Sequence, residues 1–284
     1  MQIPKLVDAH AHVQFTDYNE DRVQVIQQAL DAGIWIINAG SNLENSKEGI
    51  RLAEEYEKGV YATVGIHPSE AGEGFNKEKM RLLTSHPKCV AIGECGLEYP
   101  SRVRLAEMGF SEIDNKEEQA ELFTHHINLS HETEKPLVIH CRDAYEDLYE
   151  ILKKNENLLI KGRPALMHFF SGSIASAEKF LELGCIFSFG GAATFPPKPN
   201  QTDFISLIKI LPAQAIVLET DCPYVSPEPF RGKRNEPLHI TYVAEKIAEI
   251  KGISLQEIAE QTTENAIKFF AINEVVSYNY EIDK

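Results

Sequence analysis

The chain has 284 residues, of which 43% are hydrophobic and 25% charged, a composition typical of globular proteins and unlike that of fibrous or disordered chains. Lys and Arg total 28 against 43 Asp and Glu, so the net charge is −15. A surface with this charge repels polyanions on average, which excludes a protein that binds nucleic acid through general basic charge. No apolar run has the roughly 18 residues of a membrane helix, and no signal-like segment begins the chain, so a cytoplasmic protein is expected. Five cysteines without a C-x-x-C pair predict reduced thiols.

Eight short apolar segments alternate with longer segments of helical spacing, the pattern of repeated β-α units. The predicted strands are residues 6–11, 34–39, 60–65, 90–93, 137–140, 165–169, 186–189 and 216–219. Segments of helical spacing include residues 21–32, 46–58, 116–133, 144–154 and 173–183, followed by 237–250 and 254–270. The longest predicted loops are 97–115 and 190–203. This pattern predicts an α/β fold, a single (β/α)8 TIM barrel domain over residues 1–284 with additional C-terminal helices.

Polar side chains stand at the predicted carboxyl ends of five of these strands. The first strand leads into His10 and His12, and strand alternation turns both imidazoles to the same face. Barrel enzymes build their sites on this rim, and buried ionisable groups cost several kcal/mol unless they are paired or coordinated. The pattern therefore predicts one metal centre, formed by His10, His12, Glu94, His140, His168 and Asp221.

These four histidines and two carboxylates can bind two divalent metal ions if one carboxylate bridges them, and Glu94 is the predicted bridge. The mixed nitrogen and oxygen donors suit zinc or manganese and also allow magnesium. Two ions about 3.5–4 Å apart would lower the pKa of a shared water from about 15.7 toward 7. The residues therefore predict a hydrolase that uses hydroxide at neutral pH.

Six sequence blocks, in this order and almost end to end, resemble the TatD family of metal-dependent hydrolases in the wider amidohydrolase-like group. The blocks are Asp8-Ala-His-Ala-His12, Gly65-Ile-His-Pro68, Ile92-Gly-Glu-Cys-Gly-Leu97, Ile139-His-Cys-Arg-Asp-Ala144, His168-Phe-Phe-Ser-Gly-Ser173 and Glu219-Thr-Asp-Cys-Pro-Tyr224, with 231–237 after the last. Together they are highly specific for that family.

The resemblance implies a role for each matching residue. One metal would be held by His10, His12, Glu94 and Asp221, and the other by Glu94, His140 and His168. Glu94 and Asp221 would be the catalytic carboxylates, with Asp221 accepting the proton of the attacking water. Phosphate contacts would come from His67, Arg142 and Arg231, since the arginine fork matches phosphate oxygens.

Each predicted phosphate contact also has a plain structural alternative. His67 could shape the loop before Pro68, Arg142 could pair with Asp143 or an outer helix, and Arg231 could belong to a solvated turn. Three cysteines directly follow predicted ligands, and strand alternation should turn them away from the metals; they are Cys95, Cys141 and Cys222. Trp35 is expected to lie in the core.

The chain departs from the family pattern in places that bear on substrate choice. Glu98 stands where the family usually carries Asp, and the segment 100–115 is longer than typical and lacks the usual basic residues. The loop 190–203 offers Lys198 as its one obvious cation. The predicted metal residues are unaffected by these departures.

The resemblance implies phosphodiester hydrolysis by an exonuclease-like deoxyribonuclease that trims single-stranded or damaged DNA. No track of aromatic and basic residues demands a long nucleic acid. One alternative is an ester or amide hydrolase, such as an aminoacyl-tRNA deacylase. Another is a metal-binding protein without catalysis, which the presence of all six predicted ligands and the predicted base disfavours.

Overall fold

The computed structural model describes residues 4–99, 115–198 and 202–272, which contain a closed barrel of parallel strands. The strands are β1 (Leu6–Ala11), β2 (Ile34–Asn38), β3 (Val60–Val64), β4 (Cys89–Glu98), β5 (Leu137–Arg142), β6 (Ala165–Met167), β7 (Ile186–Phe189) and β8 (Ile216–Leu218). They pair in chain order, and β8 closes the barrel by pairing with β1. The predicted TIM barrel is confirmed. Most of the long predicted loop 97–115 lies outside the described residues.

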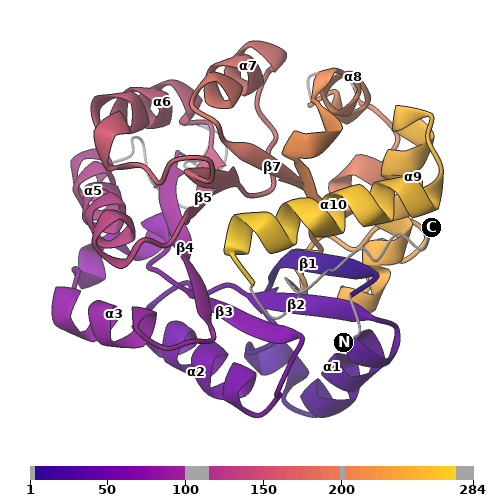
Figure 1. The fold of residues 1–284 in the computed structure, drawn as a ribbon, viewed down its shortest axis with the longest axis horizontal. Helices are drawn as coiled ribbons and strands as arrows, with labels where there is room; N and C mark the ends of the chain where they lie inside the picture. Colours follow the sequence, from indigo (N-terminus) through magenta and orange to yellow (C-terminus); the bar gives the residue numbers. More distant parts are fainter. Residues whose placement is uncertain (1–3, 100–114, 199–201, 273–284) are drawn as a thin grey trace, which may run out of the picture.

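Helices surround the barrel, as Figure 1 shows. Within the described ranges they are α1 (Arg22–Asp31), α2 (Leu43–Glu54), α3 (Lys77–Thr84), α5 (Lys116–Thr133), α6 (Tyr145–Lys154), α7 (Ile174–Glu182), α8 (Phe204–Ile210), α9 (Ile240–Lys251) and α10 (Leu255–Phe270). The segment predicted as a helix from residue 237 begins instead as a 3-10 turn, η6 (Pro237–His239). Among the described helices, none combines the length and the apolar composition of a membrane span.

Helix α2 begins three residues before its predicted start because Asn42 caps it. The Asn42 side chain accepts a hydrogen bond from the backbone N–H of Asn45 at 2.9 Å.

We expect Asn42→Ala to lower the free energy of unfolding by about 1 kcal/mol, measured by urea denaturation. The matched control is Asn128→Ala on the exposed side of α5, which should be neutral or slightly stabilising because alanine favours a helix interior. Equal denaturation midpoints for the two variants would contradict the capping role.

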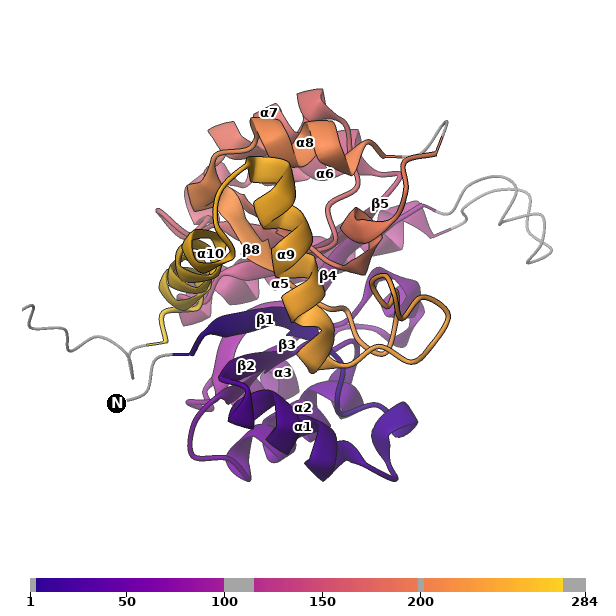
Figure 2. The ribbon, with the colours of Figure 1, turned by 90° about the vertical axis from the view of Figure 1, so that its right-hand side faces the viewer.

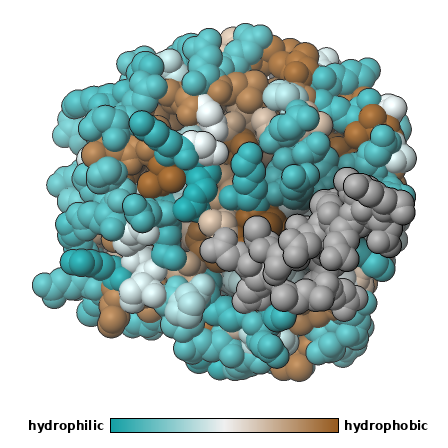
Figure 3. All heavy atoms as spheres, in the orientation of Figure 1, coloured by the Kyte–Doolittle hydropathy of each residue, from teal (hydrophilic) through white to brown (hydrophobic). Residues whose placement is uncertain are grey.

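Helix α10 closes the amino-terminal mouth of the barrel. Asn265 donates hydrogen bonds to the carbonyls of Ala213 and Ile216 at the start of β8, and Thr263 donates to the carbonyl of Lys5 before β1. Figure 2 shows α10 at one end of the barrel and the long loop after β8 at the other. The face over which α10 lies is largely hydrophilic at its surface (Figure 3). The carboxyl-terminal mouth is therefore the end that remains for a site.

The lower part of the barrel interior is filled by apolar side chains. Trp35 is buried there and its ring lies 5.8 Å from that of Tyr61, so the prediction that Trp35 belongs to the core is confirmed. The same buried cluster contains Val7, Ala9, Ile37, Ala91, Val138, Leu166, Val217, Phe269 and Phe270. This layer and α10 together form a closed floor beneath the carboxyl-terminal mouth.

A bulge in β1 aims the two histidines into the barrel. The pairing of β1 with β2 shifts between Asp8 and Ala11. Ala9 packs in the interior layer, and the next residue, His10, also reaches the interior, where regular alternation would have turned it outward. A bulge re-aims the side chains that follow it, so His10 and His12 share the inner face above the floor.

Strand β4 is longer than the predicted 90–93, and the expected strand end before Glu94 is wrong. After a register shift between Ile92 and Cys95, β4 continues along β5 until Glu98 lies opposite Arg142. Glu94, whose polar side chain suggested a strand end, instead faces the mouth of the barrel from within β4. Since Glu94 and Glu98 are four residues apart, alternation places both carboxylates on the same face.

Candidate metal centre

The predicted ligands of β1, β4 and β8 meet at the mouth of the barrel. The Nε2 atoms of His10 and His12 lie 3.2 Å apart. The Nε2 atom of His10 lies 3.3 Å from Oε2 of Glu94, and that of His12 lies 3.5 Å from Oδ1 of Asp221. These four side chains are buried or nearly so, which leaves little water to solvate them.

The other two predicted ligands approach the opposite oxygen of Glu94. His140 places Nδ1 2.9 Å from Oε1 of Glu94, and His168 places Nε2 3.5 Å from the same oxygen. The rings of His10 and His168 are stacked with centroids 3.6 Å apart. The structure therefore brings all six predicted ligands into one cluster, with one Glu94 oxygen directed to each side.

The spacing of the donor atoms around His10 and His12 fits metal coordination better than mutual hydrogen bonding. Ligands bound at 2.0–2.2 Å to one ion stand about 2.8–3.6 Å from each other when their bond angles lie between square and tetrahedral values. The separations of His10 from His12 and Glu94, and of His12 from Asp221, fall between 3.2 and 3.5 Å. Most of these distances exceed those of ordinary N–H···O hydrogen bonds. Nitrogen and carboxylate donors at this spacing fit the divalent cations predicted from the sequence.

Both carboxyls of the cluster are ionised. Burial alone would raise the pKa of Glu94, but nearby imidazoles, first that of His10, hold this pKa well below its usual value. Burial likewise opposes ionisation of Asp221, and the neighbouring imidazoles, first that of His12, lower its pKa. Two negative charges in one mouth, with Glu94 buried and Asp221 partly buried, favour the binding of cations.

Acceptors behind the histidines fix which nitrogen faces the cluster. His168 Nδ1 lies 2.9 Å from Oε2 of Glu219, and that carboxylate also accepts a hydrogen bond from the hydroxyl of Ser188. His12 Nδ1 lies 3.0 Å from the carbonyl oxygen of Ala39. In both histidines, Nδ1–H would donate outward and leave the Nε2 lone pair for a metal. Glu219 was missing from the sequence prediction, although it precedes Asp221 by two residues.

His67 directs an N–H group toward Glu94. Its Nδ1 accepts a hydrogen bond from the backbone N–H of Ser69 at 3.1 Å, so the proton of the neutral ring lies on Nε2. That Nε2 atom is 3.6 Å from Oε1 of Glu94, and burial lowers the pKa of His67 to about 4. The loop-shaping alternative is also realised, because the same ring caps η2 (Pro68–Glu73). A neutral ring with Nε2–H is suited to donate to a substrate oxygen.

The two predicted arginines have different surroundings. Arg142 lies with Nη1 3.3 Å from Oε1 of Glu98, so its acidic partner is Glu98, on the neighbouring strand. Arg231 lies over the ring of Phe195, 4.2 Å from its centroid, and 3.9 Å from a Glu228 oxygen. Their side chains remain 44% and 46% exposed, so both are accessible to a ligand.

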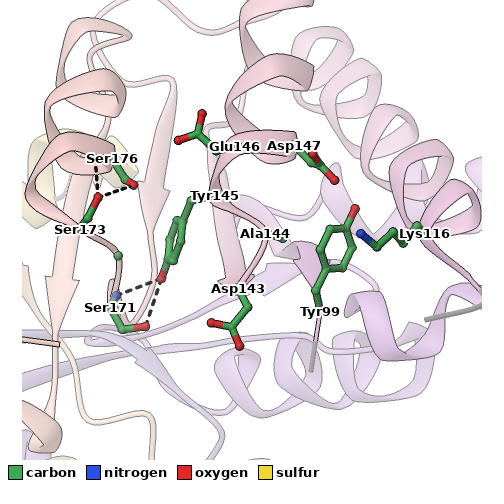
Figure 4. Close-up of a pocket in the computed structure, with 11 residues that line it drawn as sticks. Tyr99, Lys116, Asp143, Ala144, Tyr145, Glu146, Asp147, Ser171, Ser173 and Ser176 are labelled. Atoms are coloured by element: carbon green, nitrogen blue, oxygen red, sulfur yellow. Dashed lines mark hydrogen bonds between the residues drawn. The ribbon is translucent and has the colours of Figure 1, made fainter. Parts of the chain in front are cut away.

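A groove of about 550 Å³ lies on the same rim, beside the first residues of α5, α6 and α7 (Figure 4). Three carboxylates line it, those of Asp143, Glu146 and Asp147. The cation among its described lining residues is Lys116, whose Nζ lies 4.0 Å above the ring of Tyr99. An acidic wall of this kind repels phosphate, so the groove is a poor path for a nucleic acid backbone.

The cysteines near the predicted ligands have no part in this cluster of donors. All five cysteines are free and buried, as the sequence predicted. Cys95 donates through its thiol to the carbonyl of Val138 at 3.5 Å, and burial raises the pKa of its thiol well above the usual value. A buried thiol with a raised pKa is inert, and it packs in the wall of the barrel.

The family of the chain follows from comparison with known proteins. A family model described as "TatD related DNase" matches residues 7–271. The chain belongs to this family. The resemblance drawn from the six sequence blocks is thereby confirmed, and the chain is a metal-dependent hydrolase of the TatD family.

Relatives of the chain match it over nearly its whole length. The metal-dependent hydrolase YabD of Bacillus subtilis (strain 168) is 37% identical over 273 residues, which cover 94% of this chain and all of that protein. The 3'-5' ssDNA/RNA exonuclease TatD of Erwinia tasmaniensis is 30% identical, with 93% and 99% covered. The crystal structure of YJJV, a TatD homologue from Escherichia coli K12, has a TM-score of 0.80 and 27% identity, with 94% and 98% covered.

Proposed function

We propose that this TatD family hydrolase cleaves phosphodiester bonds of single-stranded nucleic acid from one end, with two divalent cations held by the six clustered ligands. A relative that shares 30% of its residues is named a 3'-5' ssDNA/RNA exonuclease, which supports this substrate class. The net charge of −15 means that the substrate must be held by local groups at the mouth.

The observation that carries the proposal is the position of Glu94. Its Oε2 faces His10 and its Oε1 faces His140 and His168, so one carboxylate has a separate set of imidazoles at each oxygen. A bridging carboxylate between two nitrogen-donor sets is the arrangement that holds two cations close together. Such a pair, when bound, lowers the pKa of water and neutralises charge on phosphoryl oxygens.

Residues of the chain would perform the remaining steps. Asp221, which is ionised and lies beside His12, would accept the proton of the attacking water. His67 would donate its Nε2–H to a phosphoryl oxygen, which develops negative charge during the reaction. Arg231 would contact a phosphate at the mouth, where its guanidinium is already stacked on Phe195.

Digestion of end-labelled single strands tests the proposed function. The purified chain, stripped with a chelator and reloaded with Mn²⁺ or Zn²⁺, is incubated with oligonucleotides labelled at the 3′ or the 5′ end. We expect labelled mononucleotides at early times from one of the two substrates, and no cleavage without metal. Metal-dependent hydrolysis of an aminoacyl ester without diester cleavage would contradict the proposal, as would absence of any hydrolysis by the loaded protein.

A further inference from the structure

The ring nitrogen of His140 that faces away from Glu94 is held by a second carboxylate. Oε2 of Glu98 lies 2.5 Å from Nε2 of His140, while Nδ1 of the same ring faces Glu94. A neutral imidazole has one N–H and one lone pair, so the hydrogen bond at one nitrogen determines which nitrogen can bind a metal. With the proton on Nε2 donated to Glu98, the lone pair on Nδ1 is directed at the predicted second cation.

Glu98 is itself held in place from several directions. Its Oε1 lies 3.3 Å from Nη1 of Arg142, which stands opposite it on β5. Its backbone N–H donates to the side chain of Gln119, and the Gln119 amide donates back to the Glu98 carbonyl. Gln119 is buried on α5, so it ties this end of β4 to the helix layer. The Glu98 carboxylate is therefore a fixed acceptor, 13% exposed at the mouth.

A third cation site is another interpretation of this region. Donor atoms of His67, Glu98 and His140 lie within 4.8 Å of one another. Two observations favour a hydrogen bond between Glu98 and His140 instead. Two ligands of one cation stand about 2.8–3.6 Å apart, which is longer than the 2.5 Å between Glu98 and His140. His67 has its Nδ1 engaged by the backbone N–H of Ser69, which places a proton on the Nε2 atom that a third cation would need.

We infer that Glu98 is a positioning residue that fixes the tautomer and ring orientation of His140 for the second cation, and that Arg142 holds Glu98 in that role. The inference rests on the proposed two-cation site. It assigns to His140 the kind of outer acceptor that Glu219 provides for His168. It also gives Arg142 a task at the metal centre besides the predicted contact with phosphate.

Metal titration of the stripped protein tests the inference. Isothermal calorimetry with Mn²⁺ gives the number of ions and the dissociation constant of each for the parent, Glu98→Ala, Glu98→Gln and Glu98→Asp. Loss of an outer carboxylate partner typically costs 10–100-fold in metal affinity. We therefore expect Glu98→Ala to raise the dissociation constant of one of the two ions by about that factor and to leave that of the other within about threefold. Glu98→Asp, which keeps the carboxylate, should restore most of the affinity. Glu98→Gln keeps the side-chain volume, so it gives the answer if Glu98→Ala does not fold.

A control variant and a spectroscopic measurement separate positioning from general damage. Glu48→Ala removes another carboxylate paired with an arginine, at Arg51 on α2, and should bind both ions as the parent does. Nitrogen chemical shifts of the histidine rings in the zinc-loaded protein should show His140 protonated at Nε2 in the parent and a mixture of ring states in Glu98→Gln.

Three other results of the metal titration would contradict either the role of Glu98 or the two-cation site. Unchanged affinity for both ions in Glu98→Ala and Glu98→Gln would overturn the inference while leaving the two-cation site intact. Three ions in the parent and two in Glu98→Ala would make Glu98 a ligand and would also overturn it. Fewer than two ions in the parent would contradict the proposed function itself.

Discussion

Replacing Glu94 by Gln should remove turnover and at least one of the two expected metal ions. An amide has a single oxygen acceptor, so it cannot offer an oxygen both to a cation beside His10 and to a cation beside His140 and His168, as the two Glu94 oxygens would. The amide N–H would face one imidazole set and displace a cation from it. We expect the rate to fall by at least about 10³-fold, since the two ions supply the nucleophile and stabilise the developing charge.

The Glu94→Gln result is measured as metal content by elemental analysis and as the rate of release of end label. Glu48→Gln, which neutralises an exposed carboxylate on α2, should match the parent in both measurements. Circular dichroism checks that the barrel forms in each variant. A Glu94→Gln protein that kept two ions and near-parental activity would show that Glu94 does not bridge them.

Replacing Asp221 by Asn should lower kcat by about 10²–10⁴-fold, the usual contribution of a general base. Asp221 has a φ of 55°, a left-handed conformation that asparagine tolerates well, so the backbone of the loop should be kept. The cation between Glu94, His140 and His168 does not depend on Asp221 and should remain. Single-turnover rates and metal content on the same samples measure the two effects separately.

Asp143→Asn is the matched control for Asp221→Asn. Asp143 has a φ of 53° and stands on the same rim, but its side chain is exposed and lies outside the ligand cluster. This variant should hydrolyse the substrate at a rate close to that of the parent. An Asp221→Asn enzyme as fast as Asp143→Asn would exclude Asp221 as the proton acceptor.

The local part of the site could be predicted from the sequence. His10 and His12 are two residues apart, and their shared face depends on strand geometry within one segment. His140, His168 and Asp221 each follow an apolar run, and parallel strands of a barrel end on one rim, so their convergence follows from the fold class alone. The fold could be predicted for the same reason, because the β-α repeat is a local pattern.

The part that depends on pairing between strands could not be predicted. The extension of β4 to Glu98 requires its register against β5, which sets Gly96 opposite His140 and Glu98 opposite Arg142 after a bulge. Polar residues in an isolated segment indicate a strand end, whereas here they face a common mouth from within the strand. The contact between Glu98 and His140 follows from that register, so the sequence alone showed Glu98 only as a departure from the family pattern.

The most direct test of the two-cation site is an anomalous diffraction map from crystals of the parent protein loaded with Mn²⁺. We expect two peaks about 3.5–4 Å apart, one beside each oxygen of Glu94, the first against His10 and His12 and the second against His140 and His168. A single peak, or peaks away from Glu94, would contradict the account of the site on which the proposed function depends.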